Sequence, residues 1–227
     1  MAFNHLNIHN FPELKATTTE KGRRYRVGDS FYPSVTTVIG HSKKDSIIKW
    51  RKRVGEEEAN KISRIASTRG TAVHELLERY VDNEPDFLKG ELPHIVQSFK
   101  DVQPILDKNL HKVYAQEAPL YSDHLGLAGR VDCVGVWDGQ NSIVDYKTSR
   151  KVKKKEWVSN YFMQCAAYAI MWEERTGMPI TQLVVLIAVD DNPPQVFVEH
   201  RDNWTEKLID TIGKYKEEKR REKVFGK

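Results

Sequence analysis

Two acidic residues and a lysine stand on what we predict to be the two arms of one β-hairpin. Asp132 ends the segment Gly-Arg-Val-Asp, and Asp145 and Lys147 flank a tyrosine in Asp-Tyr-Lys. Between the two segments lies Asp-Gly at positions 138 and 139, a strong signal for a tight turn. Because side chains alternate between the faces of a strand, Asp145 and Lys147 share a face.

The length of the hairpin loop decides whether Asp132 joins that face. A two-residue loop at 138–139 places Asp132 opposite Asp145, and a four-residue loop at 138–141 places it opposite Lys147. In both registers the three side chains point the same way, whereas a three-residue loop would send Asp132 to the other face.

Carboxylates that face each other across two strands repel unless a positive charge lies between them. A divalent cation meets that need, and for phosphodiester hydrolysis it polarises the scissile phosphate and lowers the pKa of bound water. Lys147 can stabilise the charge that develops on the phosphate or help to activate the water. Each short motif alone is common on a solvated strand, but together they predict a metal-dependent hydrolase of phosphodiesters.

Composition narrows the class of protein and the kind of metal. The chain has 227 residues with 39% hydrophobic and 30% charged side chains, which is typical of one globular domain, and its net charge of +4 is compatible with a polyanionic partner. Its two cysteines, Cys133 and Cys165, are too few for a four-thiolate zinc or iron–sulfur site. We therefore expect Mg²⁺ or Mn²⁺, no iron–sulfur cluster and, because long apolar runs are missing, no membrane partner.

The chemistry-bearing hairpin sits among elements that alternate between helix and strand. Gly177 follows a long predicted helix as a C-terminal cap, and Pro104 is expected to interrupt another helix. The predicted strands cover 22–39 (as a hairpin), 112–121, 129–137, 142–148, 182–189 and 195–200. The predicted helices cover 47–54, 56–67, 70–82, 93–110, 156–176 and 202–223, with a loop at 83–92. The order predicts an α/β fold, a sheet core with helices packed on it.

Five motifs in this order resemble those of the PD-(D/E)XK nucleases, in particular their RecB-like members. They are Arg-Gly-Thr-Ala-Val-His at 69–74, Gln-Glu-Ala-Pro-Leu at 116–120, Gly-Arg-Val-Asp at 129–132, Asp-Tyr-Lys at 145–147, and the pair Gln164 and Tyr168. The match extends over about residues 70–168. It departs from the family name at Val131, where a proline would stand, and RecB-like members often lack that proline.

The resemblance implies a fold and a set of site residues. The fold would be a restriction-endonuclease-like core with a mixed central β-sheet flanked by helices, preceded by an N-terminal helical extension. The implied catalytic residues are Asp132, Asp145, Lys147 and Glu117; the implied metal ligands are His74, Asp132, Asp145 and the carbonyl of Tyr146. Gln164 and Tyr168 would line the DNA path, with Tyr168 stacking on a base.

Ordinary structural roles stay open for several of these residues. His74 could be a surface or core histidine of its helix, and Glu117 an exposed carboxylate on a strand. Gln164 and Tyr168 lie four apart on one helix face, where an aromatic stripe is usually core.

A narrower resemblance is to the mitochondrial genome maintenance exonuclease group and its phage relatives. It rests on Tyr-Pro-Ser-Val-Thr-Thr-Val at 32–38, followed by basic helices. It implies that Ser34 and Thr36 contact the DNA backbone and that the substrate is single-stranded DNA or DNA ends. We expect residues 1–68 to form strands and a helical arch along the DNA path, and residues 69–227 to form the nuclease core of one compact domain.

Two basic runs are candidates for phosphate contact, one at 150–155 with Lys151 and Lys153, the other at 49–53. The function predicted is a metal-dependent deoxyribonuclease, an exonuclease rather than its alternatives, a structure-specific endonuclease or a non-catalytic DNA-binding module. Without a long presequence, we expect a cytoplasmic location in a bacterial or phage-infected cell rather than a mitochondrial one.

Overall fold

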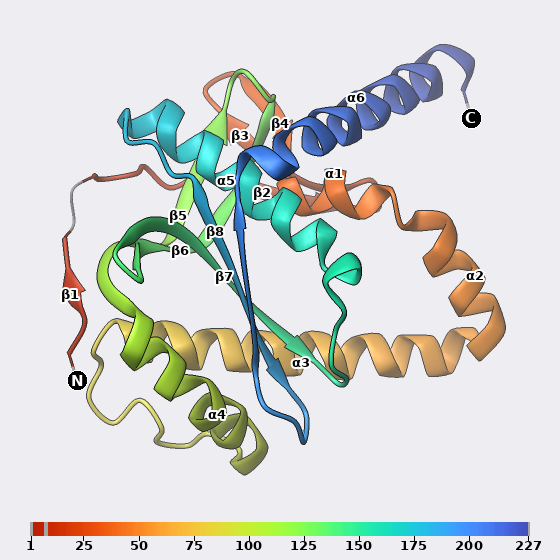
Figure 1. Cartoon of the computed structure of the whole chain (residues 1–227). Helices are drawn as coiled ribbons and strands as arrows, with labels where there is room; N and C mark the ends of the chain where they lie inside the picture. The colour runs from red at the N-terminus through yellow and green to blue at the C-terminus, as the bar shows by residue number, and fades with distance from the viewer. Residues whose placement is uncertain (1, 7–8, 227) are drawn as a thin grey trace.

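The computed structural model describes residues 2–6 and 9–226 and contains two β-sheets with helices around the larger one (Figure 1). The larger sheet has six strands in the order β1-β5-β6-β7-β8-β9, and the smaller has the order β2-β3-β4. The strands are β1 Asn4–His5, β2 Ala16–Thr19, β3 Gly22–Val27, β4 Ser30–Pro33, β5 Leu110–Ser122, β6 Leu127–Trp137, β7 Gln140–Ser149, β8 Gln182–Val189 and β9 Gln195–His200. The helices are α1 Val35–His41, α2 Lys44–Val54, α3 Glu56–Val81, α4 Pro93–Asn109, α5 Ser159–Thr176 and α6 Asp202–Phe225, with a 3-10 turn at Lys155–Trp157.

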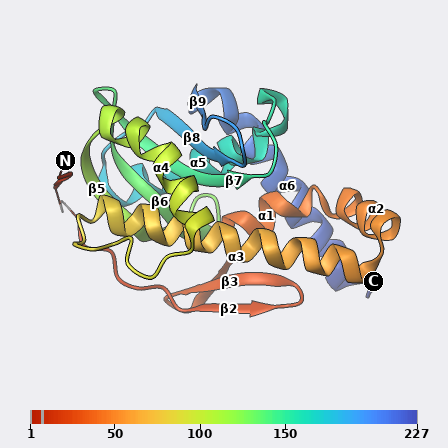
Figure 2. The same ribbon diagram turned by 90° about the horizontal axis from the view of Figure 1, so that it is seen from below.

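The larger sheet is mixed, as the resemblance implied. β5, β6 and β7 form an antiparallel meander, β8 runs parallel to β7 after the crossover helix α5, and β9 returns antiparallel to β8. One apolar cluster fills the space between the sheet and helices α3 and α4. The other lies on the opposite face, under α1, α5 and α6. In the view of Figure 2, helix α3 and strands β2 and β3 lie below strands β5 to β8 of the large sheet.

The hairpin predicted from the sequence has the two-residue loop. Trp137 pairs with Gln140, and the two loop residues both have positive φ, 48° at Asp138 and 79° at Gly139. This backbone matches the right-handed twist of the flanking strands. The pairing continues without a shift to Cys133 opposite Val144, so that Asp132 points toward the position of Asp145.

Three predictions about the helices were wrong. Residues 35–39 begin α1 rather than ending a strand, because the Ser34 hydroxyl accepts a hydrogen bond from the Thr37 N–H at 3.0 Å and caps a helix. Residues 56–81 form one helix that passes through Gly70, so the expected boundary between residues 68 and 69 falls inside α3. Helix α4 continues through Pro104, which lies on its exposed side.

The sequence patterns also missed β1 and β2. β1 has only two residues, and it is held by a parallel neighbour, β5, more than one hundred residues away. A strand this short carries no periodic signal, so only the tertiary pairing defines it.

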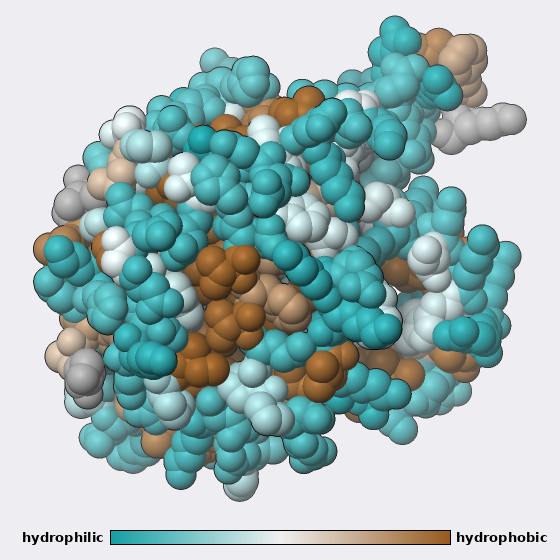
Figure 3. All heavy atoms as spheres, in the orientation of Figure 1, coloured by the Kyte–Doolittle hydropathy of each residue, from teal (hydrophilic) through white to brown (hydrophobic). Residues whose placement is uncertain are grey.

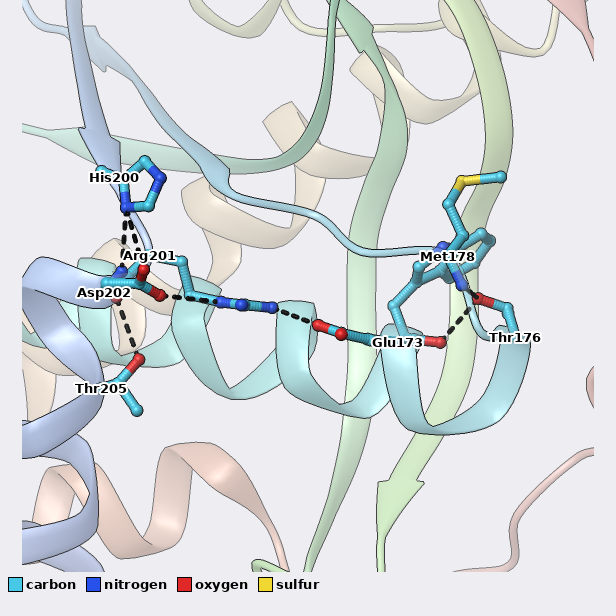
Figure 4. Close-up of polar contacts among 8 residues, drawn as sticks. Glu173, Thr176, Met178, His200, Arg201, Asp202 and Thr205 are labelled. Carbon is cyan, nitrogen blue, oxygen red and sulfur yellow. Dashed lines mark hydrogen bonds and ion pairs between the residues drawn. The ribbon is translucent and has the colours of Figure 1, made fainter.

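Helix α6 is anchored at its start by a network of polar contacts (Figure 4). Arg201 ion-pairs with Glu173 near the end of α5, and its carbonyl accepts a hydrogen bond from the Thr205 hydroxyl at 3.1 Å. At the end of α5, the Met178 N–H donates to the Thr176 hydroxyl at 3.1 Å. These contacts fix the direction in which α6 leaves the core.

No helix in the described part of the chain is long and apolar enough to cross a bilayer. The face in Figure 3 is mostly polar, with one apolar area near its middle. Both cysteines are buried and unbonded to each other.

Candidate active site

Strands β6 and β7 separate beyond Cys133 and Val144, and the candidate site lies where they part. β7 continues to Ser149 paired only with β8, so its backbone at 145–147 is no longer paired with the backbone of β6. The Asp132 carboxylate accepts a hydrogen bond from the Tyr146 N–H at 2.8 Å, and the Tyr146 carbonyl contacts the His74 ring nitrogen Nε2. The separation of β6 and β7 thus leaves the Tyr146 carbonyl oxygen unpaired with β6, beside the Asp132 carboxylate and the His74 imidazole.

Three carboxylates occupy one line across three neighbouring strands. The register places Gln116 opposite Cys133 and Ala118 opposite Val131, so Glu117 stands across from Asp132, which in turn faces the position of Asp145. His74 enters from α3, with its Nδ1 3.7 Å from an oxygen of Asp132. One ligand atom each from His74, Glu117 and Asp132 lies within 4.8 Å of the others.

Glu117 has an unusual backbone and an unusual charge environment. Its φ is 44°, a left-handed conformation that costs a residue with a side chain on the order of 1 kcal/mol or more. Burial, together with the nearby carboxylates of Asp132 and Glu78, raises the pKa of its carboxyl to about 7, against the lowering effect of Arg130. A cation among these acids would offset the repulsion that a strained and half-buried Glu117 experiences.

Glu117→Gly is therefore expected to stabilise the metal-free protein by about 1 kcal/mol, since it relieves the positive φ and removes a repelled carboxylate. Glu117→Gln, which keeps the strained backbone, should gain less. Thermal unfolding in chelator and with Mn²⁺ measures both effects. The two variants should also lose most of the stabilisation that Mn²⁺ gives the unsubstituted chain. A Glu117→Gly variant less stable than the unsubstituted chain in chelator would contradict this assignment of strain.

Asp145 and Lys147 form a buried ion pair beside the cluster. The Asp145 side chain is 2% exposed, contacts the Lys147 ammonium, and accepts a hydrogen bond from the Gln164 amide at 2.9 Å. Burial raises the pKa of Asp145 to about 6. Burial alone would lower the pKa of Lys147, but the carboxylates of Asp145 and Asp132 outweigh it and raise that pKa. Lys147 therefore carries a firmly held positive charge.

These groups open into one cleft of about 680 Å³. Eight of the predicted site residues line it: Ser34, Thr36, His74, Glu117, Asp132, Lys147, Gln164 and Tyr168. Asp145 and Tyr146 lie behind this lining, nearly fully buried. Lys151 and Lys153 lie outside it, so their contact with DNA stays a prediction.

The stacking role predicted for Tyr168 needs correction, and the contact of Ser34 with DNA stays a prediction. Tyr168 is 3% exposed and lies so close to Gly129 that a β-carbon there would stand 2.7 Å from its hydroxyl. Its ring supports strand β6, and base stacking is not open to it in this structure. The Ser34 hydroxyl is used as the N-terminal cap of α1 and is almost completely buried, which leaves Thr36 as the more accessible of the two.

Sequence reasoning gave no role to Arg130, although it stands in the recognised Gly-Arg-Val-Asp segment. Its guanidinium donates to the Glu117 carbonyl at 2.5 Å and to the Glu13 carboxylate at 2.5 Å. It therefore holds the backbone of Glu117 in its strained position. Its place two residues before Asp132 on a strand, hence on the same face, was the available signal. Other lining residues that the sequence did not single out are Arg23, Tyr25, Glu75, Glu78 and Thr148.

The residues present fit a hard divalent cation. Glu117 and Asp132 offer carboxylate oxygens, His74 an imidazole nitrogen and Tyr146 a carbonyl oxygen. Asp145 is buried beside these ligands, with one carboxylate oxygen on the Lys147 ammonium and the other on the Gln164 amide. This donor set suits Mg²⁺ or Mn²⁺ better than a soft metal, since no thiolate reaches it from the described residues.

The sequence profile of the PD-(D/E)XK nuclease superfamily matches residues 48–224, which is most of the chain. The chain belongs to the PD-(D/E)XK nuclease superfamily. Its mixed sheet flanked by helices, with acids and a lysine where β6 and β7 part, agrees with that membership. The fold predicted from the motifs is confirmed.

Two individual proteins are similar to this chain. This PD-(D/E)XK chain is 25% identical over 177 residues to human mitochondrial genome maintenance exonuclease 1, covering 71% of this chain and 50% of that protein. The chain thus spans about half the length of the curated relative. A crystal structure of a provisionally assigned exonuclease from Eubacterium rectale matches with 17% identity and a TM-score of 0.43, over 63% of each chain.

Proposed function

We propose that this nuclease is a Mg²⁺- or Mn²⁺-dependent deoxyribonuclease, an exonuclease that acts on single-stranded DNA or DNA ends. The observation that carries the proposal is the line of acids Glu117, Asp132 and Asp145 across three strands, beside His74 and the half-buried Lys147. The exonuclease activity named for the human relative supports the choice of exonuclease over endonuclease.

Each residue of the line has a role in holding the cation. His74, Glu117 and Asp132 would bind it directly, and Asp145 and the Tyr146 carbonyl would complete the set. When bound, the ion polarises the scissile phosphate and lowers the pKa of a water molecule. Asp132 has a second role, because it accepts a hydrogen bond from the Tyr146 N–H and so holds β6 and β7 together where the two strands part.

Lys147 supplies positive charge to the phosphate as negative charge develops on it. Its raised pKa means that it is protonated in the metal-free protein, so we assign it electrostatic stabilisation rather than proton abstraction. Gln164 orients Asp145 through its amide. Thr36 lies on the cleft wall, where its hydroxyl can donate to a phosphate oxygen. Lys151 and Lys153 would contact the DNA strand outside the cleft.

The test is incubation with end-labelled single-stranded and double-stranded DNA, with Mg²⁺, with Mn²⁺ and with chelator. We expect metal-dependent loss of the end label from linear single-stranded DNA and no cleavage of circular single-stranded DNA. Cutting of the circle would establish the alternative, a structure-specific endonuclease. Binding without any metal-stimulated turnover would establish the other alternative, a DNA-binding module that has lost catalysis.

A further inference from the structure

A second groove, separate from the catalytic cleft, lies between the small sheet and the C-terminal half of α6. Its volume is about 910 Å³, larger than that of the cleft. Its charged residues come from three parts of the chain that are far apart in sequence: the β2–β3 turn with strand β3, the start of α2, and the last turns of α6. Its basic lining residues are Lys21, Arg24, Lys44, Lys216, Lys219, Arg220 and Lys223.

The charge of this groove differs in sign from that of the cleft. Seven basic and two acidic side chains line it, a net charge of +5, which exceeds the +4 of the whole chain. The cleft is lined by three basic and four acidic side chains, a net charge of −1 with His74 neutral. Without a cation the cleft therefore does not attract a polyanion, and the attraction must come from elsewhere on the surface.

Several of the groove's cations are available to a ligand. Lys21, Lys44 and Lys223 are exposed and form no ion pair within the described residues. Arg24 donates to the Phe31 carbonyl at 2.9 Å, which leaves its other guanidinium hydrogens free to bond. By contrast, Lys219 and Arg220 are partly neutralised by Glu222 and Glu217.

The groove adjoins the cleft through the small sheet. Arg23 and Tyr25 of β3 line the cleft, whereas Arg24 between them points to the opposite face and lines the groove. A DNA strand that passes over the edge of this three-stranded sheet would therefore run from the groove into the cleft. The basic surface also continues past Lys44, since Lys43 lies near Lys153, and burial and the charge of Lys153 lower the pKa of Lys43.

We propose that this groove, between β3 and α6, binds the phosphate backbone of the single-stranded DNA whose end occupies the cleft. The proposal rests on the function proposed above. The groove holds the strand by salt-dependent contacts to phosphates, and the cleft supplies the chemistry. Affinity and catalysis are thereby assigned to different surfaces of one chain.

The test compares two variants with the same change of charge. The groove variant carries Lys21→Gln, Arg24→Gln and Lys223→Gln; the control carries Lys89→Gln, Lys108→Gln and Lys112→Gln, three exposed lysines outside both the groove and the cleft. The probe is a labelled single-stranded oligonucleotide of about 30 nucleotides. Fluorescence anisotropy in chelator measures binding without cleavage, at potassium chloride from about 50 to 200 mM.

The groove variant is expected to bind DNA about tenfold or more weakly at low salt. The slope of log affinity against log salt should also be shallower by about 2, the value for three lost phosphate contacts on single strands. The control should match the unsubstituted chain. Equal behaviour of the two variants, with an unsubstituted chain that binds and cuts DNA, would overturn the groove but not the nuclease. An unsubstituted chain that neither binds nor cuts would overturn both.

A second measurement does not depend on the folding of a variant. In the unsubstituted chain, DNA should protect Lys21 and Lys223 from acetylation and leave Lys89 as reactive as before. Protection that is absent from Lys21 and Lys223 under conditions of saturating DNA would contradict the groove.

Discussion

Asp132→Asn is expected to lower the rate of DNA cleavage by roughly a thousandfold or more, the largest loss that a single conservative change should produce. Asp132 is the middle acid of the line, within reach of both Glu117 and His74. Asparagine can still accept the hydrogen bond from the Tyr146 N–H, so the split between β6 and β7 is retained while the charge is lost. Single-turnover cleavage of labelled single-stranded DNA with Mn²⁺ gives the rate.

The same variant should bind DNA at least as tightly as the unsubstituted chain in chelator. The reason is electrostatic, because one negative charge leaves a cleft whose lining is net −1. Asp86→Asn removes an equal charge from an exposed turn and should leave both rate and affinity unchanged. An Asp132→Asn variant that cuts within about tenfold of the unsubstituted rate would remove Asp132 from the metal site.

Lys147→Met is expected to destabilise the metal-free protein by about 3–5 kcal/mol and to abolish detectable cleavage. Methionine approximates the length of the lysine but leaves Asp145, whose side chain is 2% exposed, as a buried charge with no cation beside it. Denaturant unfolding in chelator measures the loss of stability. Because a bound divalent ion would then be the remaining positive charge near Asp145, Mn²⁺ should stabilise this variant more than it stabilises the unsubstituted chain.

A double variant separates the charge effect from packing. Lys147→Met combined with Asp145→Asn removes both charges, and the asparagine can still bond to the Gln164 amide. Its stability in chelator should return to within about 1–2 kcal/mol of the unsubstituted chain, while cleavage stays lost. A double variant as unstable as Lys147→Met alone would show that the methionine, rather than the unpaired acid, is the cause.

The division of charge over the surface has a consequence for how the enzyme works. The cleft has the ligands for a cation but no excess of positive charge, and the groove of β3 and α6 has the positive charge but no acids in a line. Salt should therefore weaken DNA binding strongly, whereas it should affect the rate of the chemical step at saturating DNA much less. The Asp132 variant tests the chemistry of the cleft, and the groove variant tests the contribution of the groove to DNA affinity.

Much of the site could be predicted from the sequence because its main parts are local. The turn signal at Asp138 and Gly139 favours a short hairpin loop, and with the two-residue loop that the structure has, the alternation of strand residues puts Asp132, Asp145 and Lys147 on one face. The helix ending at Gly177, where φ is 73°, was equally local. The order of five short motifs identified the superfamily, which the sequence profile confirms.

The remaining features depend on contacts between distant segments. Nothing near Glu117 in the sequence signals a φ of 44°, which the Arg130 side chain helps to hold from the neighbouring strand. The withdrawal of Asp145 into an ion pair depends on Gln164 of α5. The end of α6 and the turn before β3 are about two hundred residues apart, yet they share one basic groove.

The sequence by itself thus determined the place of the hairpin turn, the shared face of Asp145 and Lys147, and the superfamily. Turn preference and side-chain alternation act between neighbours, so they operate before the chain is packed. Only the tertiary structure decided which acids meet His74, which one pairs with Lys147, and where the basic residues gather. These outcomes follow from how apolar faces of α3, α5 and α6 pack on the sheet, and burial is a property of the whole chain.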